Sequence, residues 1–302
     1  MLIDNINSIL SKLHPNYDPM KFENLSENKF KELLNSSFSD MKKAASYGNV
    51  ILRGIKKEIK SDFFMLTPSK RISENTSNVY TRLMSDILPS WSKYPKRNES
   101  FICTTSQTVA HSYGDGQVFT VYPLNDAKIA FCPDQDIWYS FLEHGRIVFL
   151  PGFMNELLLV MLYFLNYEKD THYRALFSSP ECKALREQFI FATNEEIKNL
   201  FNDVNKQIIK FKRNFSSKTI QQIQQELFSK NENNSNFYSL KIVKGILDKE
   251  DILLYLDDLL NPKKNKFRLV TTSTLAEKRD NNFNLDREVW MSGPCLFERF
   301  YT

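Results

Sequence analysis

Hydrophobic and polar positions divide the chain into four parts. Apolar residues recur at helical spacing in residues 1–47, and Gly48 ends that pattern. Residues 48–150 mainly hold short apolar runs bounded by glycine, proline or polar residues, which is typical of strands. Helical spacing returns in residues 151–262, and residues 263–302 are strand-like again. This order predicts a sheet that is opened by a helical insertion and completed by the end of the chain.

The same patterns predict the individual elements. Strands are expected at 49–55, 100–106, 117–122, 128–132, 146–150, 266–272 and 287–300. Helices are expected at 73–88, 153–166, 193–210, 217–229 and 249–260, and the polar residues 230–236 are expected to form a loop.

The composition is that of a folded protein that can bury a large core. Of the 302 residues, 42% are hydrophobic, 25% are charged and 24 are phenylalanine, which excludes disorder or a fibrous repeat as a description of the whole chain. The chain has only 8 glycines, and neither G-x-x-x-x-G-K-[ST] nor G-x-G-x-x-G occurs. The common glycine-rich nucleotide sites are therefore excluded.

Membrane, metal and disulfide chemistry have little support in the sequence. The longest apolar run, 157–165, is far shorter than the roughly twenty residues of a membrane span, and the first residues lack the features of a secretory signal. The four cysteines and four histidines are scattered without metal-ligand spacing. We therefore predict a cytoplasmic protein with buried, reduced cysteines, no bound metal and no membrane contact.

The net charge of +4 is compatible with a polyanionic partner. The densest basic runs are residues 206–213 and 262–266, which would suit phosphate groups. Such runs are also typical of solvated helix faces and loops, so both interpretations stay open.

Three short segments, far apart in the sequence, place polar groups on or beside a predicted strand. In chain order they are Arg53-Gly54, then Thr104-Thr105-Ser106 followed by Ala110 and Tyr113-Gly114, and finally Asp286-Arg287-Glu288-Val289. Each motif alone is weak, and their order is what makes the set specific.

The set resembles the motifs of the arginine / Ser-Thr-Ser / glutamate class of ADP-ribosyltransferases, a group that includes many bacterial toxins and phage-encoded enzymes. The resemblance covers the β-rich parts, about a third of the chain. It implies an α+β fold with a split, mostly antiparallel β-sandwich, here with N-terminal helices and a large helical insertion. It also implies an enzyme that transfers ADP-ribose from NAD to a macromolecule and releases nicotinamide, with NAD as substrate and no metal.

The resemblance also assigns roles to individual residues. Arg53 would offer a planar donor fork to a phosphate oxygen of NAD. Glu288 would accept the ribose 2′-OH and stabilise the positive charge that develops as the bond to nicotinamide breaks. The implied NAD-binding residues are Arg53, Gly54, Thr104, Thr105, Ser106 and Tyr113. Without the resemblance, these residues would be interpreted as a surface ion pair, ordinary strand composition and a solvent-facing glutamate.

The third segment departs from the family pattern on the acceptor side. Asp286 stands two residues before Glu288, where the family has Glu or Gln, and it is a candidate acceptor-side base. Phe283 resembles the aromatic residue of the family's acceptor-recognition turn, although a core role is equally open. Glu143 is a rival to Glu288 because its distance from Ser106 is more typical of the family, but it lacks the strand context.

The hypothesis is therefore a toxin-like or effector-like mono-ADP-ribosyltransferase of bacterial or phage type, which an antitoxin protein could control. The basic charge and Asp286 slightly favour RNA or DNA over a protein side chain as acceptor. Two alternatives stay open. One is an NAD glycohydrolase, which transfers ADP-ribose to water, and the other is a non-catalytic protein-interaction module that uses residues 151–262 to bind a partner.

Overall fold

The computed structural model describes residues 21–70, 78–165, 180–214 and 237–301. The chain divides into two compact units. The strand-bearing unit contains residues 1–72, 92–140 and 262–302, and the helical unit contains residues 73–91 and 141–261. The helical unit thus begins at residue 141 instead of the expected 151. It also includes residues 73–91, which the sequence pattern assigned to the first part of the core.

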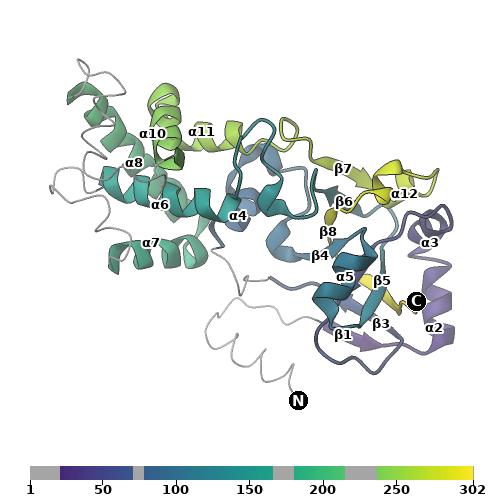
Figure 1. Cartoon of the computed structure of the whole chain (residues 1–302). Coiled ribbons are helices and arrows are strands. Elements are labelled where there is room, and N and C mark those ends of the chain that lie inside the picture. Colours follow the sequence, from purple (N-terminus) through teal and green to yellow (C-terminus); the bar gives the residue numbers. More distant parts are fainter. Residues whose placement is uncertain (1–20, 71–77, 166–179, 215–236, 302) are drawn as a thin grey trace. The chain divides into compact units, whose positions relative to one another are not determined.

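The strand-bearing unit is built on one antiparallel sheet of nine strands (Figure 1). The strands are β1 (Lys21–Asn24), β2 (Leu52–Gly54), β3 (Phe63–Thr67), β4 (Ser100–Thr104), β5 (Val118–Pro123), β6 (Lys128–Phe131), β7 (Arg268–Thr271), β8 (Glu288–Ser292) and β9 (Cys295–Arg299). Their order is β1-β3-β9-β5-β2-β4-β8-β6-β7. Because β8 lies between β4 and β6, and β9 between β3 and β5, the end of the chain completes the sheet that the first part begins. The expected α+β class with a mostly antiparallel sheet is confirmed.

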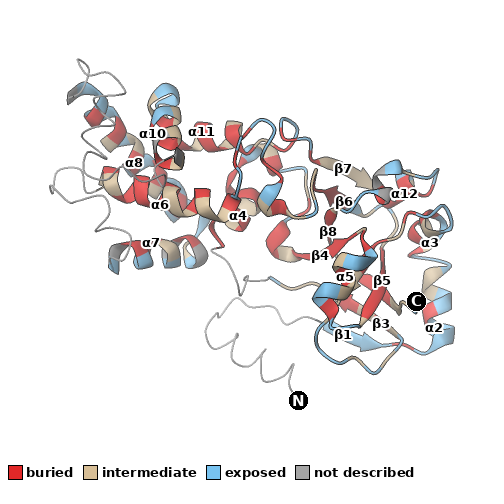
Figure 2. Cartoon of the chain, in the orientation of Figure 1, coloured by how far each residue is buried: buried red, intermediate tan, exposed pale blue. Residues whose placement is uncertain are grey.

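The sheet bends back on itself, so that its two halves share one core. Phe101 of β4 and Phe297 of β9 have ring centroids only 5.4 Å apart, although two strands separate β4 from β9 in the sheet order. In a flat sheet this separation would be about 14 Å, at about 4.8 Å per strand. Aromatic side chains of both halves fill the space between them, among them Phe64, Phe119, Phe131 and Phe297. Figure 2 shows the central strands mostly in the colour of buried residues.

Four helices pack on this sheet: α2 (Glu27–Leu34), α3 (Ser39–Ser46), α5 (Gln107–Gly114) and α12 (Thr272–Leu275). Helix α5 begins where the Ser106 side chain accepts a hydrogen bond from the Val109 amide, which satisfies one free N–H of the first turn. It ends at Asp115, whose left-handed conformation (φ 47°) precedes Gly116 (φ 92°). The expected β-rich stretch therefore contains a helix between β4 and β5.

Two motif glycines let α5 lie directly against β2. A Cβ atom added to Gly54 would overlap the Ala110 carbonyl oxygen and would lie 2.6 Å from the Gly114 amide nitrogen. A Cβ atom on Gly114 would lie 2.8 Å from the Gly54 Cα. The Arg-Gly and Tyr-Gly pairs of the sequence are thus two sides of one close backbone contact.

We expect Gly54→Ala and Gly114→Ala each to lower the free energy of unfolding by about 1–3 kcal/mol, because the added methyl group meets backbone atoms that cannot move separately. Denaturant unfolding measures the change. Gly152→Ala is the matched control, since its nearest neighbour in the helical unit is 3.4 Å away and alanine is favoured over glycine inside a helix. Equal stability of all three variants and the wild type would contradict the close contact.

The helical unit is organised around α6 (Leu150–Leu165), which is buried on almost every side. The other helices that the structure describes in this unit are α4 (Val79–Arg82), continued by a π-helix over Leu83–Ile87, and α7 (Pro180–Phe191), α8 (Asn194–Asn214), α10 (Phe237–Lys249) and α11 (Ile252–Leu259). Arg82 ties this unit together, because it pairs with Asp86 at 2.7 Å and donates to the Ala192 carbonyl at 2.9 Å.

Several expected elements are confirmed and others are wrong. The strands expected near 49–55, 100–106, 117–122, 128–132, 266–272 and 287–300 are present, as are helices at 79–87, 150–165, 194–214 and 252–259. The strand expected at 146–150 is wrong: residues 146–149 form a loop in which Ile147 makes an isolated bridge to Phe141, and Leu150 and Pro151 begin α6. The expectations for 1–20, 217–229 and 230–236 fall outside the described residues.

Residues 21–24 correct the expectation of a purely helical N-terminal part. They form β1, an edge strand with all four residues exposed, which pairs with β3 from Lys21↔Thr67 to Asn24↔Phe64. An exposed edge strand carries no alternation of buried and exposed positions, so backbone hydrogen bonds to its neighbour decide its structure.

Candidate active site

The three motif segments lie side by side in the sheet. Leu52 of β2 pairs with Thr104 of β4, and Thr104 pairs in turn with Glu288 of β8. Cross-strand partners lie on the same face of a sheet. Thr104 of the second motif and Glu288 of the third therefore lie in one row with Leu52, the residue before the arginine of the first motif. The chain separates these residues by 52 and 184 positions (104−52 and 288−104).

Glu288, the first residue of β8, is buried, with 7% of its surface exposed. Its Oε1 accepts hydrogen bonds from the Arg97 guanidinium and, at 3.7 Å, from the Cys132 thiol. Among the described residues, Oε2 has one donor, the Ile137 amide at the long distance of 3.5 Å. The carboxylate is therefore held mainly through one oxygen, and its other oxygen keeps the capacity to accept a stronger hydrogen bond.

Arg97 is the arginine that contacts Glu288. It begins a short 3-10 helix (Arg97–Glu99), and only 9% of its side chain is exposed. Its guanidinium also lies over the ring of Trp290, 5.4 Å from the centroid, and the Trp290 indole N–H donates to the Pro95 carbonyl at 2.9 Å. The segment 95–97 is thus fixed to β8 at two points, and the Arg97–Glu288 pair compensates two buried charges.

A second carboxyl group lies next to Glu288. Asp136 caps the short helix Ile137–Tyr139 by accepting the Trp138 amide at 2.8 Å. Burial first, and the negative charge of Glu288 second, raise the pKa of Asp136 to about 6, against smaller opposing effects that include the charge of Arg97. Tyr113 is more than half exposed; burial of the rest, followed by the charges of Asp136 and Glu288, raises its pKa. The charge of Glu288 thus raises the pKa of both Asp136 and Tyr113.

The raised pKa of Asp136 predicts a pH-dependent stability. The native state binds this proton at higher pH than the unfolded chain, so the stabilising contribution is complete below about pH 4 and is lost as pH rises through about 6. An asparagine side chain at this position would not ionise and could still accept the Trp138 amide. We expect Asp136→Asn to be more stable than the wild type by about 1 kcal/mol at neutral pH, after allowance for solvent screening, and equally stable near pH 4.

Unfolding curves at the two pH values measure this difference. Asp115→Asn is the control, because Asp115 is exposed and asparagine tolerates its left-handed conformation. A stability gain of Asp136→Asn that is the same at both pH values would contradict the assignment of the effect to ionisation.

The hydroxyl groups of the Thr-Thr-Ser motif make internal hydrogen bonds that position the segments on either side of Glu288. Thr104 accepts the Ser106 amide at 3.0 Å, and Ser106 caps α5. Thr105 donates to the Leu285 carbonyl at 2.6 Å and accepts the Arg287 amide at 3.0 Å. The motif thus fixes the helix that carries Tyr113 and the turn that leads into Glu288.

Arg53 lies beside this row and contacts the opposite side of β4. It follows Leu52 in β2, so strand alternation turns it away from the face of Thr104 and Glu288. Its guanidinium donates to the Ile102 carbonyl and lies 5.6 Å from the centroid of Phe101. The structure therefore brings the strand of Arg53 to the site, while Arg97 supplies the guanidinium that touches Glu288.

Of the two candidates for contact with the acceptor, Asp286 is exposed and Phe283 is buried. Asp286 is exposed two residues before Glu288, and the Gln135 side chain donates to it at 3.3 Å. Phe283 is buried against Phe131, with ring centroids 5.2 Å apart, which is a core position. The rival Glu143 lies exposed in a turn of the helical unit.

Sequence reasoning missed Arg97 and Asp136. Both occur in short polar loops, 95–99 and 133–136, where a charged residue is ordinarily solvated. Nothing in the local sequence pattern indicates that both loops lie next to Glu288 at the start of β8. The only usable signal was Pro95, which marks the loop beside β4.

The basic runs of the sequence lie in different units. Lys206 and Lys212 project from the exposed face of α8, where they pair with Asp203 at 2.9 Å and with Glu250. Residues 262–266 form a turn before β7 in the strand-bearing unit, with Lys263, Lys264 and Lys266 exposed. Lys206 and Lys212 therefore behave as part of a solvated helix face.

The four cysteines are buried, and none of them forms a disulfide. Within the described ranges, no group of three or more His, Cys, Asp or Glu side chains is arranged to hold a metal ion. No helix in the part of the chain that the structure describes is long and apolar enough to cross a membrane.

Comparisons of the chain with protein-family models, with curated proteins and with solved structures return no match.

Proposed function

We propose that the chain is a mono-ADP-ribosyltransferase that uses NAD as substrate and Glu288 as its catalytic carboxylate. The observation that carries the proposal is the row Leu52, Thr104 and Glu288, which joins the three motif strands in adjacent positions. The contact between Gly54 and Gly114 adds a second link between motifs that are distant in sequence. Chance occurrences of three weak motifs would not be expected to meet in this way.

The chemistry assigned to Glu288 is electrostatic. In the reaction, the bond between ribose C1′ and the nicotinamide nitrogen breaks, nicotinamide leaves as a neutral molecule, and a nucleophilic atom of the acceptor forms the new bond to C1′. Positive charge develops on the ribose, and a fixed carboxylate beside it lowers the barrier. Oε2 is the oxygen available for the ribose 2′-OH, because Arg97 occupies Oε1.

The remaining residues would bind and orient NAD and the acceptor. Arg53, Gly54, Thr104, Thr105, Ser106 and Tyr113 are proposed to line the NAD site. Tyr113 is the exposed side chain among them, and the hydrogen bonds of Thr104, Thr105 and Ser106 fix its helix and the turn before Glu288. The proton of the attacking group would pass to a carboxylate. Asp286, which is exposed beside Glu288, is proposed for this step.

The acceptor is proposed to be a macromolecule, with RNA or DNA favoured over protein. A toxin-like or effector-like role, with an antitoxin protein as regulator, follows from the resemblance to the family. We also propose a cytoplasmic location, since four buried thiols are typical of proteins from reducing compartments.

The direct test is incubation of the protein with NAD labelled in its adenylate part and with cell lysate. We expect nicotinamide release together with label on a macromolecule, and parallel nuclease and protease digests identify its class. Free ADP-ribose without labelled macromolecule would instead establish a glycohydrolase. If NAD stays intact, both the transferase and the glycohydrolase are contradicted, and the non-catalytic protein-interaction module is the alternative that stays open.

A further inference from the structure

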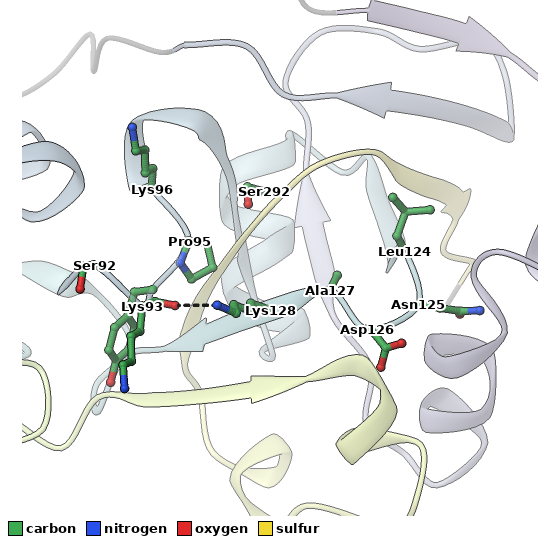
Figure 3. Close-up of a pocket in the computed structure, with 11 residues that line it drawn as sticks. Ser92, Lys93, Pro95, Lys96, Leu124, Asn125, Asp126, Ala127, Lys128 and Ser292 are labelled. Carbon is green, nitrogen blue, oxygen red and sulfur yellow. Dashed lines mark hydrogen bonds between the residues drawn. The ribbon is translucent and has the colours of Figure 1, made fainter.

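The strand-bearing unit has an open cleft of about 420 Å³ near the far end of β8 from Glu288. Residues 92–96, the β5–β6 turn with the start of β6 (124–128) and Ser292 line it (Figure 3). The volume is within the range of sites for a nucleotide-sized ligand and too small for a duplex.

The lining of this cleft is basic. Lys93, Lys96 and Lys128 are exposed lysines from two separate chain segments, and Asp126 is the acidic residue among them, so the lining carries a formal charge of +2 (three Lys less one Asp). The Lys128 ammonium donates to the Lys93 carbonyl at the long distance of 3.4 Å, which brings the two segments together (Figure 3). A lysine ammonium has three donors, and Lys128 can therefore contact a ligand as well.

The cleft and Glu288 lie on the same face of β8. Side chains alternate along a strand, so Glu288, Trp290 and Ser292 share one face. Trp290 binds the Pro95 carbonyl, and Arg97 binds Glu288, so the loop that supplies Lys93 and Lys96 is fixed to the strand of the candidate catalytic residue. Four residues of strand span about 13 Å. Because segment 95–97 covers Trp290 between them, a polynucleotide that joins the cleft to Glu288 would pass over this segment.

We propose that this cleft binds the sugar–phosphate backbone of a single-stranded nucleic acid, which the enzyme holds as acceptor while Glu288 acts on NAD. The role of this nucleic acid as acceptor rests on the proposed function, which the cleft would make more specific. Lys93 and Lys128 match phosphates of such a nucleic-acid strand, and Lys96, which pairs with Glu99 at 3.9 Å, adds to the positive charge of this segment. Tyr94, whose hydroxyl donates to the Phe267 carbonyl at 3.2 Å, adds an aromatic side chain to the lining, and aromatic side chains are the groups on which unpaired bases stack.

The test replaces the three lysines together, as Lys93→Gln, Lys96→Gln and Lys128→Gln in one protein. The probe is a fluorescein-labelled single-stranded RNA of about 12 nucleotides, and binding is followed by anisotropy between about 50 and 200 mM salt. We expect the affinity to fall about tenfold or more at the lower salt concentration. The slope of log affinity against log salt should become less steep by about 2, because each lost phosphate contact removes about 0.7.

A matched variant controls for net charge. Lys21, Lys43 and Lys57 are exposed in the same unit and lie outside the cleft, so their triple replacement by Gln changes the net charge equally. We expect it to keep wild-type RNA affinity within about threefold, since unspecific attraction alone depends on total charge. Equal losses in the two triple variants would overturn the proposal, and so would a wild-type protein that does not bind the RNA.

Enzyme activity gives an independent readout. Nicotinamide release from NAD in the absence of RNA should be the same in the cleft variant and the wild type, whereas labelling of RNA should fall with the affinity. If the wild-type protein does not cleave NAD, the proposed function fails, and the difference between the two triple variants still decides whether the cleft binds RNA. Unchanged RNA labelling in the cleft variant would overturn the acceptor role.

Discussion

Glu288→Gln is expected to lower the rate of nicotinamide release from NAD by about 100-fold to 1,000-fold, which corresponds to about 2.7–4 kcal/mol of transition-state stabilisation. Glutamine has the same shape and can still accept a hydrogen bond, but it has no negative charge to oppose the charge that develops on the ribose. It also leaves the buried Arg97 guanidinium without its carboxylate, so the rates are measured on protein that an unfolding curve shows to be folded. The loss should therefore appear in kcat and much less in KM for NAD. Initial rates at several NAD concentrations separate the two constants.

Two further variants make this result specific. Glu143→Gln is the matched control, because it removes the same charge from an exposed turn of the helical unit, and it should keep full activity. Glu288→Asp keeps the charge for Arg97 but shortens the side chain by one methylene, so it should fold normally and still lose most activity. Full activity in Glu288→Gln, or loss in Glu143→Gln, would transfer the catalytic assignment from Glu288 to Glu143.

Arg97→Met is expected to lower the free energy of unfolding by about 3–5 kcal/mol, because it leaves the buried carboxylate of Glu288 without its partner. The side chains of both residues are about 90% buried, so water cannot replace the lost guanidinium. A single-domain protein has about 5–15 kcal/mol of stability in total, and the variant is therefore expected to be visibly less resistant to urea. Unfolding of wild type and variant at neutral pH measures the difference.

The double variant Arg97→Met with Glu288→Leu separates stability from activity. Replacement of a buried ion pair by apolar residues of similar volume is often neutral or stabilising. We therefore expect this protein to recover most of the stability that Arg97→Met loses, and to remain inactive in nicotinamide release. A double variant as unstable as the single one would show that Arg97 stabilises the fold through Trp290 and not through Glu288.

Much of the fold was predictable because its elements have local signals. The apolar runs of β4, β5 and β8 lie in strands bounded by turns, and the long apolar helix α6 has no polar face. Elements without such a signal were missed. The exposed edge strand β1 depends on pairing with β3, and β3 was itself missed, although it is as long as β4 and β8. Helix α5 lies within a stretch whose overall pattern favours strands, although its Ser106 cap is visible in the sequence.

The candidate site was predictable only in part. The sequence supplied Glu288, the Thr-Thr-Ser motif and the paired glycines Gly54 and Gly114, because a motif is a local pattern of residue types. Arg53 had an expected partner in NAD, and the structure places its guanidinium on the Ile102 carbonyl instead of beside Glu288. Phe283 had two open roles, and it lies in the core against Phe131.

The sequence by itself determined the strands and helices that have a clear apolar period and the residues of the three motifs, since backbone preferences and hydrophobic period act over a few neighbouring residues. Only the tertiary structure decided that Arg97 and Asp136 accompany Glu288, and that Lys93, Lys96 and Lys128 border one cleft. The register of β8 between β4 and β6 brings these loops together. Interactions between charges depend on distance and burial in space, and neither quantity is encoded in the local pattern around any one of these residues.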